Sequence, residues 1–395
     1  MRKLIVTLIF LATTLVSIGQ TLEWVSSYGS TTFDRIWDGE IYGNQIATVG
    51  TYSGPLSYNP STTILSPVNN GGNDILLNIY DNLGQLLVSK GFGGSSSDIA
   101  KNLAYDNSGN IYMVGGFSNT VEFDRSRIGL FSKTSNGGQD AFLAKFDSNG
   151  NLIWVNTFGG TSNDEALSIA INSVNEVVIT GYYQGTVDFD PDTTVQNFSS
   201  NNNSTDIFLS KFNSNGNLVW NKTFGSTSNN EASREVVIEN NDNIILVGFY
   251  GGIMDIDPSS AVFNLAHGSQ EDSFISKFDN QGSFIFAKSL SSSSELIIKS
   301  VKISSLNEII VAGSFLNSAD FDPSSSSTVL ASSNGGADMF LLKLDSNANF
   351  VFVKTLGSSG SDVMEKIELD AADNIFCTGY YFGSMDFDPS TNGTV

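Results

Sequence analysis

The sequence predicts an all-β fold, a β-propeller of four-stranded antiparallel blades with a 66-residue repeat. The main observation is a regular series of aspartates, each of which opens a similar phrase (DILLNIYD, DAFLAKFD, DIFLSKFN, DSFISKFD, DMFLLKLD): Asp74, Asp140, Asp206, Asp272 and Asp338. A period of this kind indicates one supersecondary unit that is copied along the chain. The 28 Phe and 12 Tyr favour strands, and the 38 Gly indicate frequent turns.

The third copy shows the four expected strands most clearly. We expect them at Glu165–Asn172, Glu176–Tyr183, Asp206–Asn213 and Asn217–Phe224, with a linking segment of roughly twenty residues between the second and third. Four short antiparallel strands per unit is the composition of a propeller blade. The strands are apolar on both faces, as expected for a blade that is covered by neighbours on each side.

A hairpin signal joins the third and fourth expected strands. Asp or Asn followed three residues later by Gly predicts a tight turn, because Gly accepts the positive φ that such turns need. The signal recurs at Asp81–Gly84, Asp147–Gly150, Asn213–Gly216 and Asp279–Gly282, and Ala348 breaks it in the last copy. The fourth strand carries a large side chain at one repeated position, which we interpret as blade-to-blade packing: Trp24, Val88, Trp154, Trp220, Phe286 and Phe352.

Two segments of the third copy resemble a known repeat. The run SIAINSVNEVVITGYY, followed by DIFLSKFNSNGNLVW, resembles the SBBP-type β-propeller repeat and, more distantly, the NHL repeat. The extended form with VDFDP looks like repeats of secreted proteins from Bacteroidetes-type bacteria. The resemblance covers about residue 22 to the end. It implies a propeller and an exported or surface location, and it implies no particular activity.

The two ends of the chain have their own signals. Residues 1–19 have Arg2 and Lys3, then an apolar run and small residues, which predicts a secretory signal peptide and no membrane span after its cleavage. Residues 20–395 would form the propeller. Residues 22–28 match a fourth strand without a third, whereas the last copy stops inside its linking segment. We therefore expect six blades, with seven as the alternative, an incomplete last blade and a truncated chain. The family that it resembles often carries a C-terminal sorting or anchoring domain, and any such domain would lie beyond Val395.

Composition limits the chemistry. The net charge of −22 argues against a nucleic-acid partner, because phosphate binding needs a basic surface. The chain has one His, His267, which excludes His-rich metal sites and pairs of catalytic histidines. The one Cys, Cys377, allows no internal disulfide, and we expect it to be a small core residue. We predict no enzyme.

The acidic motif of the linking segments is the one candidate site. It reads Glu122-Phe-Asp124 in the second copy and Asp-Phe/Ile-Asp-Pro in the later ones, where two carboxylates share a side and Phe or Ile points inward. Such oxygens suit Ca²⁺, the only cofactor that the sequence suggests. The alternative interpretation is turn chemistry, because Asp side chains bond backbone N–H groups two residues on. The candidate ligands are Asp188, Asp190, Asp192, Asp255, Asp257, Asp320, Asp322, Asp386 and Asp388.

A Lys recurs in the third strand, at Lys145, Lys211, Lys277 and Lys343. Because a Lys inside a covered blade must reach solvent or a carboxylate, we expect a structural ion pair across blades. The sequence favours an exported, non-catalytic scaffold, secreted or at the outer cell surface, that acts as a monomer and binds a protein or polysaccharide there. The alternatives are a glycan-active propeller hydrolase or lyase, and a spacer carrying a missing C-terminal domain.

Overall fold

The structure is a computed structural model, and it describes residues 27–387 except 31, 60–66, 192–194, 227–230, 266–270, 325–326 and 386. The predicted signal peptide, Trp24, Asp192, His267, Asp386 and Asp388 lie outside the described residues. The chain divides into two compact units, Met1–Thr157 and Phe158–Val395. Each unit has its own hydrophobic core. Among the described residues, no helix is long and apolar enough to cross a membrane.

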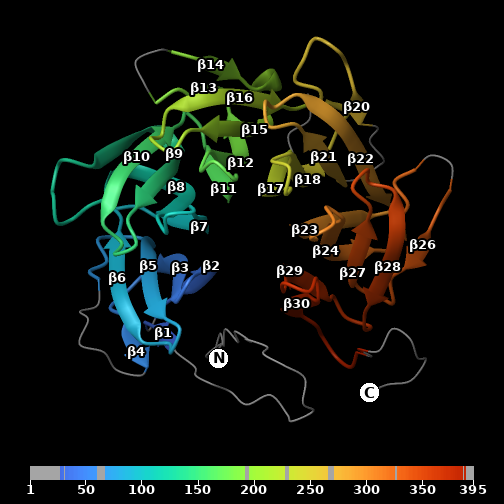
Figure 1. Cartoon of the computed structure of the whole chain (residues 1–395), viewed down its shortest axis with the longest axis horizontal. Coiled ribbons are helices and arrows are strands. Elements are labelled where there is room, and N and C mark those ends of the chain that lie inside the picture. The colour runs from blue at the N-terminus through green and yellow to red at the C-terminus, as the bar shows by residue number, and fades with distance from the viewer. Residues whose placement is uncertain are drawn as a thin grey trace. The chain divides into compact units, whose positions relative to one another are not determined.

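The first unit holds two four-stranded antiparallel sheets, here called the first and second blades (Figure 1). The strands of each blade are neighbours in chain order. The first blade consists of β2 (Arg35–Tyr42), β3 (Gln45–Tyr52), β5 (Asp74–Asp81) and β6 (Leu86–Phe92). The second consists of β7 (Ile99–Tyr105), β8 (Ile111–Glu122), β9 (Ser132–Phe146) and β10 (Leu152–Phe158). Their first strands, β2 and β7, contact each other.

The second unit repeats this pattern (Figure 1). The third blade consists of β11 (Glu165–Ile171), β12 (Val177–Gln184), β15 (Thr205–Phe212) and β16 (Leu218–Phe224). The fourth consists of β17 (Ala232–Ile238), β18 (Ile244–Tyr250), β21 (Asp272–Phe278) and β22 (Phe284–Ser292). The fifth consists of β23 (Glu295–Ile303), β24 (Ile309–Leu316), β27 (Asp338–Leu344) and β28 (Phe350–Leu356). A two-stranded sheet follows, β29 (Val363–Leu369) and β30 (Ile375–Tyr380).

Within the second unit, the first strands of successive sheets again contact each other: β11 with β17, β17 with β23, and β23 with β29. Antiparallel four-stranded sheets whose first strands lie side by side are the building pattern of a propeller. The predicted all-β, propeller-like fold is therefore confirmed. The strands predicted in the third copy are confirmed to within one residue at their ends.

The predicted Asp-x-x-Gly turns have the expected backbone. Gly84, Gly150, Gly216 and Gly282 have φ values of 76°, 71°, 88° and 75°. Ala348 keeps this left-handed conformation, with φ of 60°, although it carries a Cβ. A Cβ at Gly282 would lie 3.2 Å from the Trp220 ring, so the turn of one blade packs on the fourth-strand aromatic of the preceding blade. This contact confirms the predicted blade-to-blade packing of Trp220.

Each first strand contains a β-bulge, which the sequence analysis missed. In β11 the bulge is at Leu167, between Ala166 and Ser168, and the facing residue of β12 is Gly181. A Cβ at Gly181 would lie only 1.9 Å from the Glu165 carbonyl oxygen. Glycines facing the other bulges would meet a backbone oxygen at 1.9 to 2.4 Å: Gly50, Gly115, Gly248, Gly313 and Gly379. The bulge therefore requires Gly at one position of every second strand.

A polar side chain just after the bulge links neighbouring blades at four of the six bulges that the structure describes. The residue concerned is Asp38, Ser168, Glu235 or Ser300, and its oxygen accepts a bond from a backbone N–H of the next first strand. The donors are Leu103, Val236, Val301 and Ile367, at 3.2, 3.1, 2.6 and 3.3 Å. Since a bulge disrupts the ladder, these side chains satisfy N–H groups that would otherwise be buried without a partner.

Two details of the chain ends bear on the sequence expectations. The described part of the segment 22–28 lies in β1 (Ser27–Gly29), which pairs with β4 (Ser57–Asn59) in the first linking segment. The end of β22 pairs similarly with the fifth linking segment, so β1 occupies the place of a fourth-strand end. The expectation for Cys377 is wrong: this residue is exposed, because β30 pairs only with β29 among the described strands.

Candidate functional site: the linking loops

The linking loops join the second and third strands of each blade, and all but the first carry the acidic motif. In the third blade the loop forms a small hairpin of β13 (Thr186–Asp188) and β14 (Asn197–Ser199). Corresponding pairs are β19 (Met254–Asp255) with β20 (Asn264–Leu265), and β25 (Ser318–Asp320) with β26 (Leu330–Ser332). In the second blade, β8 and β9 themselves extend into the loop. The loops are thus short ordered hairpins.

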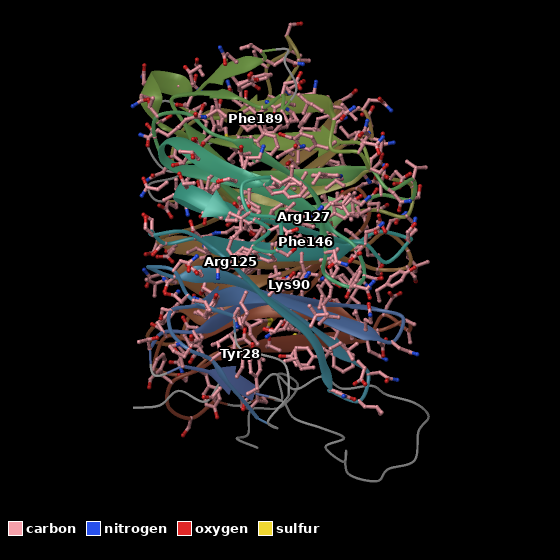
Figure 2. The ribbon with its side chains drawn as sticks, turned by 90° about the vertical axis from the view of Figure 1, so that its left-hand side faces the viewer. Tyr28, Lys90, Arg125, Arg127, Phe146 and Phe189 are labelled. Carbon is pink, nitrogen blue, oxygen red and sulfur yellow. The ribbon has the colours of Figure 1, made fainter. Side chains whose placement is uncertain are left out.

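The central Phe or Ile anchors the loop in four of the five motifs. Phe123, Phe189, Ile256 and Phe321 are buried, with at most 1% exposure, whereas Phe387 of the last motif is 54% exposed, so the inward orientation predicted for it is wrong. Phe189, labelled in Figure 2, contacts the rings of Tyr183 and Phe208 at centroid distances of 5.5 and 5.0 Å. Burial of such a ring contributes roughly 2 to 3 kcal/mol. The inward orientation predicted for the four buried residues is therefore confirmed.

The first carboxylate of each motif spans its loop. Asp188 Oδ1 accepts bonds from the backbone N–H of Asp190, at 3.1 Å, and of Gln196, at 2.9 Å. The same two-donor pattern occurs at Asp255, from Asp257 and Phe263, and at Asp320, from Asp322 and Val329. One oxygen therefore holds both ends of the loop together, as the turn interpretation requires.

The second carboxylate of the motif stabilises the following turn. Asp257 Oδ1 accepts the N–H of Ser259 at 2.9 Å, and Asp322 accepts the N–H of Ser324 at 2.9 Å and the hydroxyl of Ser327. The Ser327 hydroxyl is the main cause that lowers the pKa of Asp322. Asp322 therefore stays ionised to a lower pH than an ordinary Asp carboxyl does.

The second blade varies this arrangement with a cation. Asp124 accepts the N–H and hydroxyl of Ser126 and forms an ion pair with Arg127, with 2.6 Å between Nε and Oδ2. Burial works to raise the pKa of Asp124, but the bonds from Ser126 and Arg127 outweigh it and hold the pKa low. Glu122 closes the loop by accepting the N–H of Gly129 at 2.7 Å.

No group of three or more His, Cys, Asp or Glu side chains arranged to hold a metal occurs within the described residues. Of the candidate ligands, the structure places Asp188 with Asp190, Asp255 with Asp257, and Asp320 with Asp322, each pair within one loop. Calcium binding at these loops stays a prediction. Their carboxylates have turn-forming bonds without any ion.

Each linking loop also exposes a large aliphatic side chain at or near its tip, which the sequence analysis missed. These residues are 67% to 84% exposed: Val68, Ile128, Val195, Val262 and Leu330. Val195 and Val262 each precede the residue whose N–H bonds the first carboxylate. The loops of the five blades therefore each present at least one solvated aliphatic group, and the second and fourth also expose Leu130 and Ile253, by 66% and 68%. The sequence signal was present, as a Val, Ile or Leu inside otherwise polar loops.

The repeated lysines form structural ion pairs, but within a blade. Lys211 Nζ lies 2.8 Å from Glu176, and Lys277 Nζ lies 2.7 Å from Glu239, in both cases in the same blade. What crosses to the next blade is a hydrogen bond from Lys Nζ to a turn carbonyl, of Asn280 at 2.7 Å and of Ser346 at 3.2 Å. The expectation of ion pairs across blades is thus corrected, because the acid lies on the turn between the first two strands.

The position of the paired acid alternates between copies. In the second and fourth blades the acid, Asp106 or Glu239, is the first residue of a five-residue turn, and an Asn is the last residue of that turn. In the third and fifth blades the acid, Glu176 or Glu308, is the last residue of the turn, and the first residue is Asn172 or Ser304. In the first blade, Ile79 stands at the Lys position, opposite Val88, and the turn Gly43-Asn44 has no acid. The charges are therefore gained and lost together.

Two acidic side chains of the first strands, Asp38 and Glu235, are buried and hold the bulged backbone. Burial works to raise the pKa of Glu235, yet Lys366, 3.1 Å away, and Lys302 keep that pKa below its usual range. A carboxylate held ionised in this way is a poor proton donor at neutral pH.

Comparison with known proteins agrees with the repeat architecture. No family model matches the chain. The chain is 25% identical over 199 residues to an uncharacterised WD repeat-containing protein of Acanthamoeba polyphaga mimivirus. The matched stretch covers 45% of this chain and 14% of that protein. It is 25% identical over 219 residues to the regulatory protein FlaEY of Caulobacter vibrioides, which covers 53% of this chain and 21% of that protein.

The chain therefore spans about a fifth or less of the length of these relatives. The extracellular domain of a hybrid two component system of B. thetaiotaomicron shares 9% identity over 87% of this chain and 63% of that one, with a TM-score of 0.20, which carries no argument. WD repeats are four-stranded propeller blades. The fold and the WD-repeat relative thus fit a β-propeller-type repeat protein. The first relative is uncharacterised, and the second is named as a regulatory protein.

Proposed function

We propose that this protein is an exported, non-catalytic β-propeller scaffold, of the SBBP type, that binds or displays at the cell surface or outside the cell. The observation that carries the proposal is the set of linking loops of the second to fifth blades, each anchored by a buried Phe or Ile and presenting an exposed aliphatic residue. A rigid loop loses little conformational entropy on binding. Repeated weak sites on one scaffold also gain by avidity.

The chemistry of the loops suggests the partner. An aliphatic tip beside carboxylates such as Asp190 or Asp322 suits a surface protein or polysaccharide that offers apolar patches and cationic or hydroxyl groups. The net charge of −22 disfavours nucleic acid. We expect the chain to act as a monomer.

Capture from the cell envelope tests this function. The mature chain would be immobilised beside a variant with three loop tips changed, Val195→Ser, Val262→Ser and Leu330→Ser. The matched control changes Val174→Ser and Leu306→Ser, which are 66% and 74% exposed on turns outside the loops. We expect the loop variant alone to lose the captured component. Equal capture by all three proteins would refute a role for the loops.

We further propose that Ca²⁺ stabilises the loops through Asp188 and Asp190. Thermal unfolding would be followed with Ca²⁺ and with EDTA, for the mature chain and for Asp188→Asn with Asp190→Asn. A saturable rise in Tm that the double variant abolishes is the expected result. If millimolar Ca²⁺ leaves the Tm unchanged, the carboxylates serve only as turn formers.

A further inference from the structure

Two sets of carboxylates recur in the blades. The first set opens each third strand, at Asp74, Asp140, Asp206, Asp272 and Asp338, all at most 5% exposed. The second set lies three residues before each bulge: Asp98, Asp164, Glu231 and Asp362 are buried, Asp34 is half-buried, and Leu296 stands in the remaining copy. Among the described residues, the two sets come together at three junctions between blades, Asp74 with Asp98, Asp206 with Glu231, and Asp338 with Asp362. A buried pair of carboxylates needs a neutralising partner, because like charges in a low dielectric repel strongly.

The two carboxylates of a junction are held together by a backbone bond. The N–H of Asp98 donates to the carbonyl of Asn73 at 2.6 Å, next to Asp74 in the chain. The N–H of Asp362 donates to the carbonyl of Ala337, also at 2.6 Å, next to Asp338. The first junction, Asp74 with Asp98, and the last, Asp338 with Asp362, therefore share one backbone geometry.

An arginine neutralises the first junction. Arg125 extends from the second linking loop, and its NH2 lies 3.0 Å from Asp74 Oδ2 and 3.4 Å from the Gly93 carbonyl oxygen (Figure 2). Its NH1 donates to the Val68 carbonyl. One cationic group thus sits among a carboxylate and two carbonyl oxygens. This arrangement shows that the junction accepts a cation.

Hydroxyl groups donate hydrogen bonds to both carboxylates at the junction of Asp206 with Glu231. Ser204 Oγ donates to Asp206 Oδ1 at 2.7 Å, the N–H of Asn201 donates to Asp206 Oδ2 at 2.9 Å, and Ser226 Oγ donates to Glu231. Both oxygens of Asp206 therefore have a donor.

The last junction has neither an arginine nor hydroxyl donors to Asp338 among the described residues. Asp362 accepts the N–H of Ser358 at 2.6 Å and of Phe382 at 2.8 Å, so both its oxygens act as acceptors, as in the ionised form. Asp338 Oδ2 accepts only the N–H of Asn334, at 3.1 Å, and the buried Asp338 Oδ1 has no hydrogen-bond partner. Burial, and then the Asp362 carboxylate, raise the pKa of Asp338.

The residues around Asp338 resemble those that hold the guanidinium of Arg125. Gly357 stands where the first junction has Gly93, and a Cβ there would lie 1.9 Å from Asp338 Cγ, so the carboxylate rests directly on this glycine. Ser332 stands where the first junction has Val68, whereas the residue aligned with Arg125 is Pro389, which has no charge. The oxygen-bearing positions are thus kept and the cation is not.

We propose that the junction of Asp338 and Asp362 binds a divalent metal cation, with Ca²⁺ as the ion of matching chemistry. Carboxylate and carbonyl oxygens on a buried turn are the ligands that Ca²⁺ takes. The ion would do at this junction what Arg125 does at the first one. The site is separate from the linking loops and does not depend on the proposed function.

The test compares Ca²⁺ stoichiometry in three variants by isothermal titration of metal-free mature chain with CaCl₂. Asp338→Asn should lose one bound Ca²⁺. Arg125→Ala should gain one, because it opens the junction of Asp74 and Asp98. Arg127→Ala is the matched control, because it removes a neighbouring arginine that pairs with Asp124 in the loop. It should leave the number of bound Ca²⁺ ions unchanged.

The outcomes separate the possible explanations. Unchanged stoichiometry in Asp338→Asn together with no gain in Arg125→Ala would overturn the proposal. The proposal would also be overturned if Asp338→Asn had a higher Tm than the parent and Ca²⁺ changed the Tm of neither protein. A proton, and not a metal ion, would then neutralise the pair. Should Asp338→Asn fail to fold, the gain in Arg125→Ala decides. Asp188→Asn with Asp190→Asn reports on the loops alone, so that failure of either proposal is recognised independently.

Discussion

Replacement of Lys277 by Met should strongly destabilise the fourth blade. Lys277 Nζ lies 2.7 Å from Glu239 Oε1, and the two side chains are 9% and 0% exposed. The change leaves the Glu239 carboxylate buried without its cation, and breaking a buried pair in this way costs about 3 to 5 kcal/mol. Lys277→Met with Glu239→Gln removes both charges, so it should recover most of that loss.

The free energy of unfolding would be measured by urea denaturation, with Trp fluorescence as the signal. Lys343→Met is the matched control, because it holds the same repeat position in the fifth blade but it and its partner Glu308 are each 23% exposed, so the loss of this pair should cost clearly less. The reasoning is refuted if Lys277→Met costs less than about 1 kcal/mol, or if the double variant is no more stable than the single one.

Three further predictions follow from the buried backbone and carboxylates. Gly181→Ala should lower the free energy of unfolding by several kcal/mol in urea denaturation, because its Cβ would meet the Glu165 carbonyl at 1.9 Å. Gly29→Ala is the control and should cost little, because the nearest atom would lie 3.7 Å from its Cβ. Equal losses in the two variants would contradict the bulge argument. Burial raises the pKa of three carboxyls to about 6: Asp98, Asp164 and Asp206. Their folded state binds protons more tightly than the unfolded chain, so their contribution is full below pH ~4 and is lost as the pH rises through about 6, by at most about 3 kcal/mol each. Urea denaturation from pH 4.5 to 7.5 measures this loss, and a steady rise in stability over that range would contradict it. Arg125→Ala should lower the Tm of the mature chain in EDTA, and added Ca²⁺ should restore it; a Tm loss that Ca²⁺ leaves unchanged would count against a cation at this junction.

The period of the sequence was sufficient to predict the fold class, the strands of each blade and the turns that close them. The reason is physical: a blade is covered on both faces, so its strands must be apolar throughout, and its hairpins need residues that accept positive φ. Gly150 and Gly216 were recognised in this way, and so was the inward orientation of Phe189 and Ile256.

Pairing between side chains could not be derived from the period. Lys277 and Glu239 are 38 residues apart, and the acid changes its place in the turn from copy to copy, so no fixed spacing relates the two. Asp74 likewise pairs with Arg125, which is 51 residues further along the chain, and the 66-residue period does not relate these two positions. Repeated local contacts are encoded by periodic residues, and the sequence alone determined these. Which charges neutralise one another depends on how neighbouring blades pack, because a buried charge responds to distance and desolvation and not to sequence separation, and only the tertiary structure decided that.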